Sequence, residues 1–136
     1  MTDHVDRKTR SIIMAAVHSK NTKPELAVRK IVFALGYRYR LHGSKLPGRP
    51  DLVFAARRKA IFVHGCFWHR HTRCKYATTP KTRIRYWEEK FDTNVVRDRR
   101  NRRELKNAGW AVLTVWQCEL KNPEKLTERV DEFLSA

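Results

Sequence analysis

The sequence has few cysteines and no long hydrophobic run. Its three cysteines are an odd number and too few for a disulfide framework, so metal binding or catalysis explains them better. No stretch approaches the roughly 18 apolar residues that a membrane span requires. The first 20 residues are polar and charged, unlike a secretory signal. We therefore expect a soluble intracellular protein with no membrane partner.

Acidic residues are also scarce. There are 14 of them against 30 lysines and arginines, which gives a net charge of +16. A charge of this size attracts polyanions and repels copies of the same chain. Charge alone would allow DNA, RNA or an anionic membrane as the partner, and we favour a nucleic acid. A small basic protein that only binds nucleic acid, as ribosomal and histone-like proteins do, is the alternative that charge leaves open.

The chain has no internal repeat and no low-complexity linker. Its 136 residues match the usual size of one domain, and a hydrophobic content of 41% is enough for one core. We expect a basic N-terminal DNA-binding arm over residues 1–20 and a single domain over residues 21–136.

The apolar pattern predicts three helices and four strands in the domain. Thr22 is a good helix cap before Pro24 and Glu25, and Gly36 ends that helix. The other expected elements are strands at 37–41, 51–54, 60–63 and 110–115, a helix from Arg83 to near Gly109, and a helix opened by Asn122-Pro123. The expected apolar faces hold Leu26, Ile31 and Leu35 on the first helix, with Val28 and Val32 nearby, and Ile84, Trp87, Phe91 and Val95 on the long one. A strand–helix–strand crossover requires parallel pairing, so we predict an α/β fold with helices on a small mixed sheet.

Histidines and cysteines are concentrated in residues 64–74. A structural zinc ion takes four nitrogen or sulfur ligands, and Cys66, His71 and Cys74 are close enough in sequence to share one. If the last two strands are neighbours, Cys118 returns beside Cys66 and completes the set. His69 is an alternative to His71 on spacing alone, and buried free cysteines that act as small hydrophobic residues are the alternative to a metal site.

A second group of residues is suited to phosphodiester cleavage. Asp51 follows a proline-directed turn, where a carboxylate can face a cleft, although a single such aspartate is usually only a turn residue. His64 ends the neighbouring strand, Glu25 begins a helix that can pack nearby, and His69 follows. A hard carboxylate ligand suits magnesium and a neutral histidine suits a general base, which Asp98 on the long helix could orient.

Aromatic and basic residues lie close in sequence to these candidate ligands and catalytic residues. Phe67 and Trp68 lie in a polar, basic loop, where stacking on DNA bases and packing around the loop are equally good explanations. The spacing of Trp87 favours a place in the core. The basic run on the long helix, which includes Arg97, Arg99 and Arg100, is expected to contact phosphates, although such runs are often only solvated.

These residues together resemble a known family, the very-short-patch repair endonucleases. The resemblance covers roughly residues 5–120. Its motifs are Leu46-Pro47-Gly48-Arg49-Pro50-Asp51, Phe62-Val63-His64-Gly65-Cys66-Phe67-Trp68-His69, Tyr86-Trp87-Glu88-Glu89-Lys90, Asn94, Arg97-Asp98-Arg99-Arg100 and Gly109-Trp110 with Val115-Trp116. It implies the fold of type II restriction endonucleases.

The resemblance also implies an activity and its partners. Members of the family nick one strand 5′ to the thymine of a T·G mismatch and so start the repair of deaminated 5-methylcytosine. We therefore expect a zinc-containing, magnesium-dependent nickase that binds mismatched double-stranded DNA as a monomer. We expect it in the bacterial cytoplasm, associated with the nucleoid, with functional links to a cytosine-5 DNA methyltransferase and to repair proteins.

Residue roles follow from the same resemblance. Asp51 and the backbone carbonyl of Val63 would bind magnesium, and His69 would be the general base, oriented by Asp98. His64 and Glu25 would hold water bound to the metal. The zinc ligands would be Cys66, His71, Cys74 and Cys118.

The DNA contacts implied by the resemblance form a separate set. Phe67, Trp68 and Trp87 would form a wedge in the major groove, which replaces the core position that spacing favours for Trp87. Met14 on the basic arm would enter from the minor groove. Lys90 and Asn94 would contact the mismatched pair.

One departure from the wider restriction fold matters. That fold usually pairs its aspartate with an acidic-x-lysine motif on the third strand, and this chain has Ile61-Phe62-Val63-His64 there, as the family does. Two other functions remain open. One is a sequence-specific nicking or restriction-type endonuclease on fully paired DNA, and the other is a zinc-containing DNA-binding module without catalysis.

Overall fold

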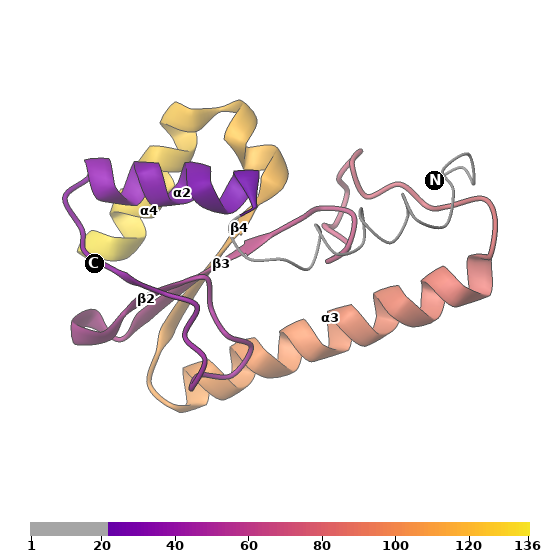
Figure 1. Cartoon of the computed structure of the whole chain (residues 1–136), viewed down its shortest axis with the longest axis horizontal. Coiled ribbons are helices and arrows are strands. Elements are labelled where there is room, and N and C mark those ends of the chain that lie inside the picture. Colours follow the sequence, from indigo (N-terminus) through magenta and orange to yellow (C-terminus); the bar gives the residue numbers. More distant parts are fainter. Residues whose placement is uncertain (1–21) are drawn as a thin grey trace.

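A four-stranded mixed sheet lies between helices on its two faces in the computed structural model (Figure 1). The structure describes residues 22–136, so the predicted arm at 1–20 and Met14 within it lie outside the described residues. The strands are β1 (Arg40–Leu41), β2 (Leu52–Phe54), β3 (Lys59–His64) and β4 (Ala111–Trp116). The order in the sheet is β1-β2-β3-β4, and only β3 and β4 pair in parallel among these strands. The predicted mixed sheet with a parallel crossover is confirmed.

Three α-helices cover this sheet. They are α2 (Lys23–Ala34), α3 (Ile84–Asn107) and α4 (Pro123–Ser135), with short 3-10 turns η1 (Ala55–Arg57) and η2 (Gln117–Lys121) between strands and helices. Figure 1 shows α2 and α4 together on one face and α3 along the other. None of the helices among residues 22–136 has the length and apolar character to cross a membrane.

The sequence signals at the ends of α2 work as predicted. The Thr22 hydroxyl accepts a hydrogen bond from the amide of Glu25 at 3.4 Å, so Thr22 is the cap. At the other end, Gly36 has φ +92°, and the Tyr37 amide donates to the carbonyl of Val32 at 3.3 Å. This Schellman closure uses residue 37 to end the helix, which helps to explain why β1 is shorter than the predicted strand at 37–41.

The core lies between the sheet and the pair formed by α2 and α4. Its buried members are Val28, Val32, Leu52, Phe54, Ile61, Leu113, Val115, Leu126, Val130 and Leu134. Two predicted apolar positions are wrong, because Leu26 is 41% exposed and Ile84 is 51% exposed. On α2 the face toward the sheet is formed by Val28 and Val32, which are one helical turn apart. On α3, Ile84 is the first residue, at the end remote from the sheet (Figure 1).

A buried lysine joins the sheet to the end of α4. The Nζ atom of Lys59, the first residue of β3, donates hydrogen bonds to the carbonyls of Phe133 at 2.7 Å and Leu134 at 3.2 Å. The last carbonyls of a helix have no partner within the helix, and they carry its negative dipole end. Lys59 therefore caps α4 with a positive charge and fixes its distance from β3.

Candidate active site and metal centre

A cleft of about 900 Å³ opens beside the ends of β2 and β3. The start of α2, the loop before β2, the end of β3 and the middle of α3 supply its walls. It brings together the predicted catalytic residues Glu25, Asp51, His64 and Asp98 from these four segments and His69 from the loop after β3. Val63, whose backbone carbonyl is an expected magnesium ligand, also lines the cleft. The basic residues Arg97 and Arg100 line it too.

Asp51 occupies the place where the pairing of β2 with β3 stops. The last paired residues are Leu52 and Ile61, and the next available amide, that of Val63, donates to the Oδ2 atom of Asp51 at 2.6 Å. Burial raises the pKa of Asp51 to about 6; the Val63 hydrogen bond opposes this rise and the charge of Glu25 adds to it. A nearby cation would strongly favour the ionised form of a carboxyl group in this position.

The two histidines of the cleft form a stack that ends on a carboxylate. The rings of His64 and His69 lie 3.8 Å apart and 6° from parallel. The Nδ1 atom of His69 lies 2.6 Å from Oδ2 of Asp98 on α3. Burial alone would raise the pKa of Asp98, but the hydrogen bond and the charge of His69 outweigh it, so its pKa lies below the ordinary value. An ionised Asp98 fixes Nδ1 as the donor and leaves Nε2 of His69 as the proton acceptor.

His64 is the buried partner in this stack. It is 5% exposed, and within residues 22–136 its Nδ1 atom has no hydrogen-bond partner. Burial and the neighbouring His69 lower the pKa of His64 to about 3. His64 is therefore neutral at physiological pH and offers an uncharged imidazole to the cleft.

Glu25 lies beside Asp51 rather than beside the histidine stack. Its Oε1 atom accepts a hydrogen bond from Arg29 at 2.9 Å and lies 2.6 Å from Nε2 of His42. The sequence interpretation missed His42, which it placed in an ordinary turn-rich loop. Only the position of His42 opposite Asp51 could have been inferred from the sequence, because an antiparallel hairpin that pairs Leu41 with Leu52 puts residue 42 there.

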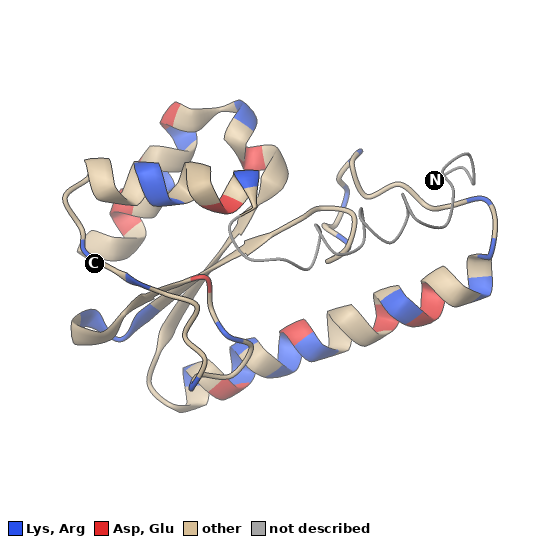
Figure 2. Cartoon of the chain, in the orientation of Figure 1, with Lys and Arg blue, Asp and Glu red and all other residues tan. Residues whose placement is uncertain are grey.

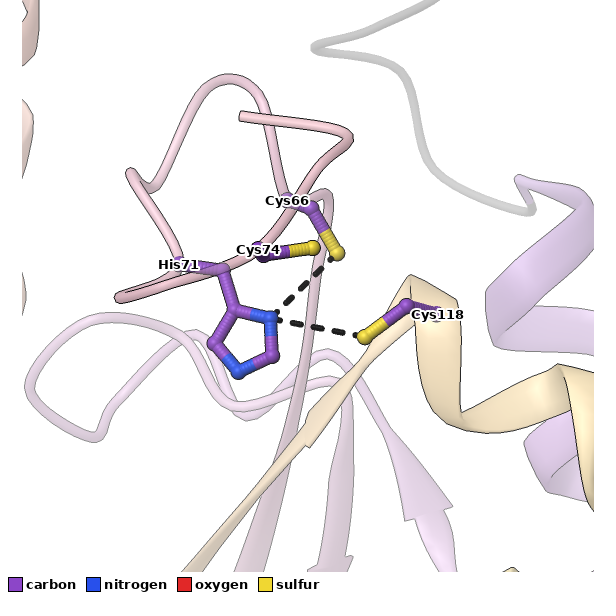
Figure 3. A group of neighbouring side chains, drawn as sticks. All are labelled: Cys66, His71, Cys74 and Cys118. Carbon is purple, nitrogen blue, oxygen red and sulfur yellow. Dashed lines mark hydrogen bonds between the residues drawn. The ribbon is translucent and has the colours of Figure 1, made fainter. Parts of the chain in front are cut away.

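Three cysteines and one histidine form the second centre (Figure 3). The ligand atoms of Cys66, His71, Cys74 and Cys118 all lie within 4.8 Å of one another. The Nδ1 atom of His71 is 3.7 Å from the sulfur of Cys66 and 3.4 Å from that of Cys118. A tetrahedral zinc ion with ordinary bond lengths requires nitrogen–sulfur separations of about 3.5 Å. The four residues therefore fit one such ion.

The register of β3 and β4 explains this convergence. His64 pairs with Trp116, so Cys66 and Cys118 each follow two residues beyond the paired positions. The ring of Trp116 stacks on His71 at 4.2 Å and 9°, which orients the imidazole toward the sulfurs. Of the two histidines considered from spacing, the structure places His71 with the cysteines and His69 with Asp98. Burial raises the pKa of the Cys66 thiol to about 12, so a bound cation would be needed to hold it as a thiolate.

The aromatic residues of the loop pack against α3. Phe67 makes edge contacts with Trp68, Trp87 and Phe91, with ring centroids 5.2 to 5.7 Å apart. Phe67 and Trp68 are half-buried, whereas Trp87 is only 7% exposed. Trp87 thus takes the buried position that its spacing indicates, and it forms the floor on which the two loop aromatics lie.

The polar residues predicted to contact DNA occupy different environments on α3. Lys90, Arg97, Arg99 and Arg100 are exposed, and Figure 2 shows basic residues along the half of α3 next to the sheet. Asn94 is buried; its Nδ2 atom donates to the carbonyl of Trp68 at 3.1 Å, and its Oδ1 atom accepts from Arg97 at 2.9 Å. Asn94 therefore ties the aromatic loop to α3.

The fold is that of an endonuclease catalytic domain. The structure resembles the catalytic domain of the homing endonuclease I-Bth0305I with a TM-score of 0.59 and 24% sequence identity, over 83% of this chain and 94% of that one. The predicted endonuclease-type α/β fold, with a cysteine–histidine cluster able to hold a metal, is confirmed.

Sequence comparison makes the assignment specific. The family model "DNA mismatch endonuclease Vsr" matches residues 2–75. The type II nicking enzyme V.XorIIP of Xanthomonas oryzae pv. oryzae is 47% identical over 98% of both chains. The DNA mismatch endonuclease Vsr of Escherichia coli K12 is 42% identical over 98% of this chain and 88% of its own length. The chain belongs to the Vsr endonuclease family and is a DNA endonuclease, as its motifs predict.

Proposed function

We propose that this endonuclease nicks one DNA strand 5′ to the thymine of a T·G mismatch and so starts the repair of deaminated 5-methylcytosine. The observation that carries the proposal is the cleft in which Asp51 faces the pair formed by His69 and Asp98. The basic residues Arg97, Arg100 and Arg102 and the loop residue Trp68 line the same cleft. The name of the Escherichia coli relative supports a mismatch substrate, and the names of other relatives support nicking.

Asp51 and the Val63 carbonyl would hold a magnesium ion, for which oxygen ligands are suited. When bound, the ion would supply positive charge to the phosphate and make a water molecule more acidic. His69 accepts the proton of the attacking water at Nε2, while Asp98 holds Nδ1 and stabilises the resulting imidazolium. His64 and Glu25 would position water at the ion. The stack with neutral His64 keeps His69 in its orientation without adding charge.

The second centre would hold a structural zinc ion through Cys66, His71, Cys74 and Cys118. The loop that carries Cys66, His71 and Cys74 has little regular structure, with backbone hydrogen bonds such as His71 N to Cys66 O at 3.0 Å. A closed four-ligand site stabilises such a loop directly. The ion would thereby fix the position of His69 and of the aromatic residues between its ligands.

The mismatch would be recognised by the aromatic loop and α3. Phe67 and Trp68 form the part of the wedge able to enter the major groove, supported from below by Trp87. Met14 would enter from the minor groove. Lys90 would reach the mismatched pair directly, whereas Asn94 must exchange its bond to the Trp68 carbonyl to do so. Arg97, Arg99 and Arg100 would bind the DNA phosphates. The protein would act as a monomer.

The substrate is tested with end-labelled duplexes that differ in one base pair, T·G or T·A, in several sequence contexts with Mg²⁺. We expect a nick 5′ to the thymine in the mismatched duplexes and none in the paired ones. Equal nicking of both would overturn mismatch recognition and assign the protein to enzymes that cut a fixed paired sequence. Tight binding without cleavage in any context would leave a DNA-binding module instead.

A further inference from the structure

A second group of side chains able to bind a metal includes Asp51 but neither of the two stacked histidines. The ligand atoms of Glu25, His42 and Asp51 all lie within 4.8 Å of one another. His42 Nε2 is 2.6 Å from Glu25 Oε1, and Glu25 is buried. Two carboxylates and one imidazole therefore converge at one edge of the active-site cleft.

The backbone holds His42 in this position. Its amide donates to the carbonyl of Asp51 at 3.1 Å, and the next amide, that of Gly43, donates to Pro50 at 3.0 Å. A Cβ atom at Gly43 would lie 2.7 Å from the side chain of Val53, so the hairpin packs too tightly for a larger residue. These contacts hold His42 and Asp51 opposite each other on one short hairpin, more rigidly than a flexible loop would.

Charge also favours a cation here. Two carboxylates close together and largely removed from water repel each other unless positive charge is shared between them. Arg29 contacts Glu25 at 2.9 Å and balances one of the two charges. A divalent ion between His42 and Asp51 would balance the second.

We propose that His42 supplies an imidazole nitrogen to the divalent cation held by Asp51, which makes this a mixed oxygen–nitrogen site that binds Mn²⁺ more tightly than Mg²⁺. Magnesium strongly prefers oxygen ligands, whereas imidazole favours transition metals, and Mn²⁺ accepts both. The inference rests on the proposed function, because that function makes Asp51 a metal ligand.

The test is electron spin-echo envelope modulation spectroscopy of bound Mn²⁺. The ion is added in less than equimolar amount to the zinc-loaded full chain without DNA. A directly bound imidazole gives a nitrogen modulation, which we expect in the wild type and not in His42→Asn. Asparagine suits this position, because residue 42 has φ +50° and asparagine tolerates that backbone. His69→Asn is the matched control and should keep the signal.

Modulation that persists in His42→Asn and disappears in His69→Asn would overturn the proposal, as would a wild type without nitrogen modulation. His42→Gln provides a second variant if zinc content or circular dichroism shows that His42→Asn is misfolded. By calorimetry we expect His42→Asn to weaken Mn²⁺ binding roughly tenfold or more and Mg²⁺ binding less. Equal losses for the two ions would also contradict it.

Asp51→Asn separates this inference from the proposed function. If that variant loses Mn²⁺ binding while His42→Asn keeps the nitrogen signal, the metal site stands and His42 is excluded from it. If Asp51→Asn binds Mn²⁺ as the wild type does, the proposed catalytic metal site is itself wrong.

Discussion

At the scale of single residues, the site depends on a few side chains whose environments oppose their ordinary chemistry. Asp51 is a carboxylate placed where burial favours its neutral form. His64 is a histidine that burial keeps uncharged. Such departures are typical of functional sites, although structural networks also produce them. Here the two groups line the same cleft, which strengthens the functional explanation.

The raised pKa of Asp51 predicts a pH dependence of stability in the absence of Mg²⁺. Because its pKa of about 6 in the folded protein exceeds the ordinary 3.8, Asp51 favours folding below about pH 4 and loses that contribution as the pH rises through 6. The shift corresponds to about 3 kcal/mol. We expect the free energy of unfolding of zinc-loaded wild type to fall by up to this amount relative to Asp51→Asn between pH 4 and 7, in urea titrations. A difference between the two proteins that does not change with pH would contradict this.

Trp68 gives a prediction about DNA at the same scale. Its ring is half-buried, lies at the cleft and rests on Trp87 at 5.5 Å. If it stacks on a base, Trp68→Ala should weaken binding to a T·G duplex by about 1 to 3 kcal/mol in a gel-shift titration. Tyr76→Ala, at an exposed aromatic outside this cluster, is the control and should bind nearly as the wild type does. Unchanged affinity for Trp68→Ala would limit Trp68 to packing.

At the scale of elements, the cysteine–histidine cluster could be predicted because the chain has few candidate metal ligands. Three cysteines and the expected neighbourhood of β3 and β4 were enough to select Cys66, Cys74 and Cys118. Choosing His71 over His69 required the resemblance or the structure, since both lie within reach in sequence. The contact of His42 with Glu25 was beyond the sequence, because it depends on how α2 packs beside a hairpin.

The proposed role of Cys118 as the fourth zinc ligand is tested by Cys118→Ser. We expect this variant to lose bound zinc and to expose the loop at 64–74 to proteolysis, because three ligands hold the ion much less well than a closed set. Zinc content by atomic absorption measures the first effect. Gln117→Ser, at the exposed neighbouring position, should retain the metal. Stoichiometric zinc in Cys118→Ser would remove this residue from the site.

Lys59 gives an element-scale prediction about stability. Lys59 lies on β3, is only 8% exposed, and caps α4 with its amine. The sequence did not predict this contact, because a lysine in a strand is normally solvated. Lys59→Met should lower the free energy of unfolding by about 2 to 3 kcal/mol, since charged hydrogen bonds to the helix end are lost. Lys125→Met, at an exposed lysine of α4, should change it by less than about 0.5 kcal/mol in the same denaturant titration.

At the scale of the whole molecule, the parallel pairing of β3 and β4 gathers both centres at one end of the sheet. His64 and Trp116 end these strands, and the candidate metal ligands and the loop with His69 follow directly. The helix α3 crosses from this end to the far side and brings Asp98 and the basic residues with it (Figures 1 and 2). The predicted order of elements was sufficient to anticipate this arrangement, whereas the apolar faces of α2 and α3 were predicted less well because their packing direction depends on the neighbouring layers.

The central claim is that Asp51 in this cleft is the carboxylate on which strand cleavage depends. The most direct test is single-turnover cleavage of an end-labelled T·G duplex with Mg²⁺, run in parallel with gel-shift binding for wild type and Asp51→Asn. We predict that Asp51→Asn binds the duplex within about twofold of the wild type, because its contacts with DNA remain, and that cleavage falls by about a hundredfold to a thousandfold, as expected when electrostatic stabilisation of the transition state is lost. Cleavage of the duplex by Asp51→Asn at a rate near that of the wild type would contradict the account.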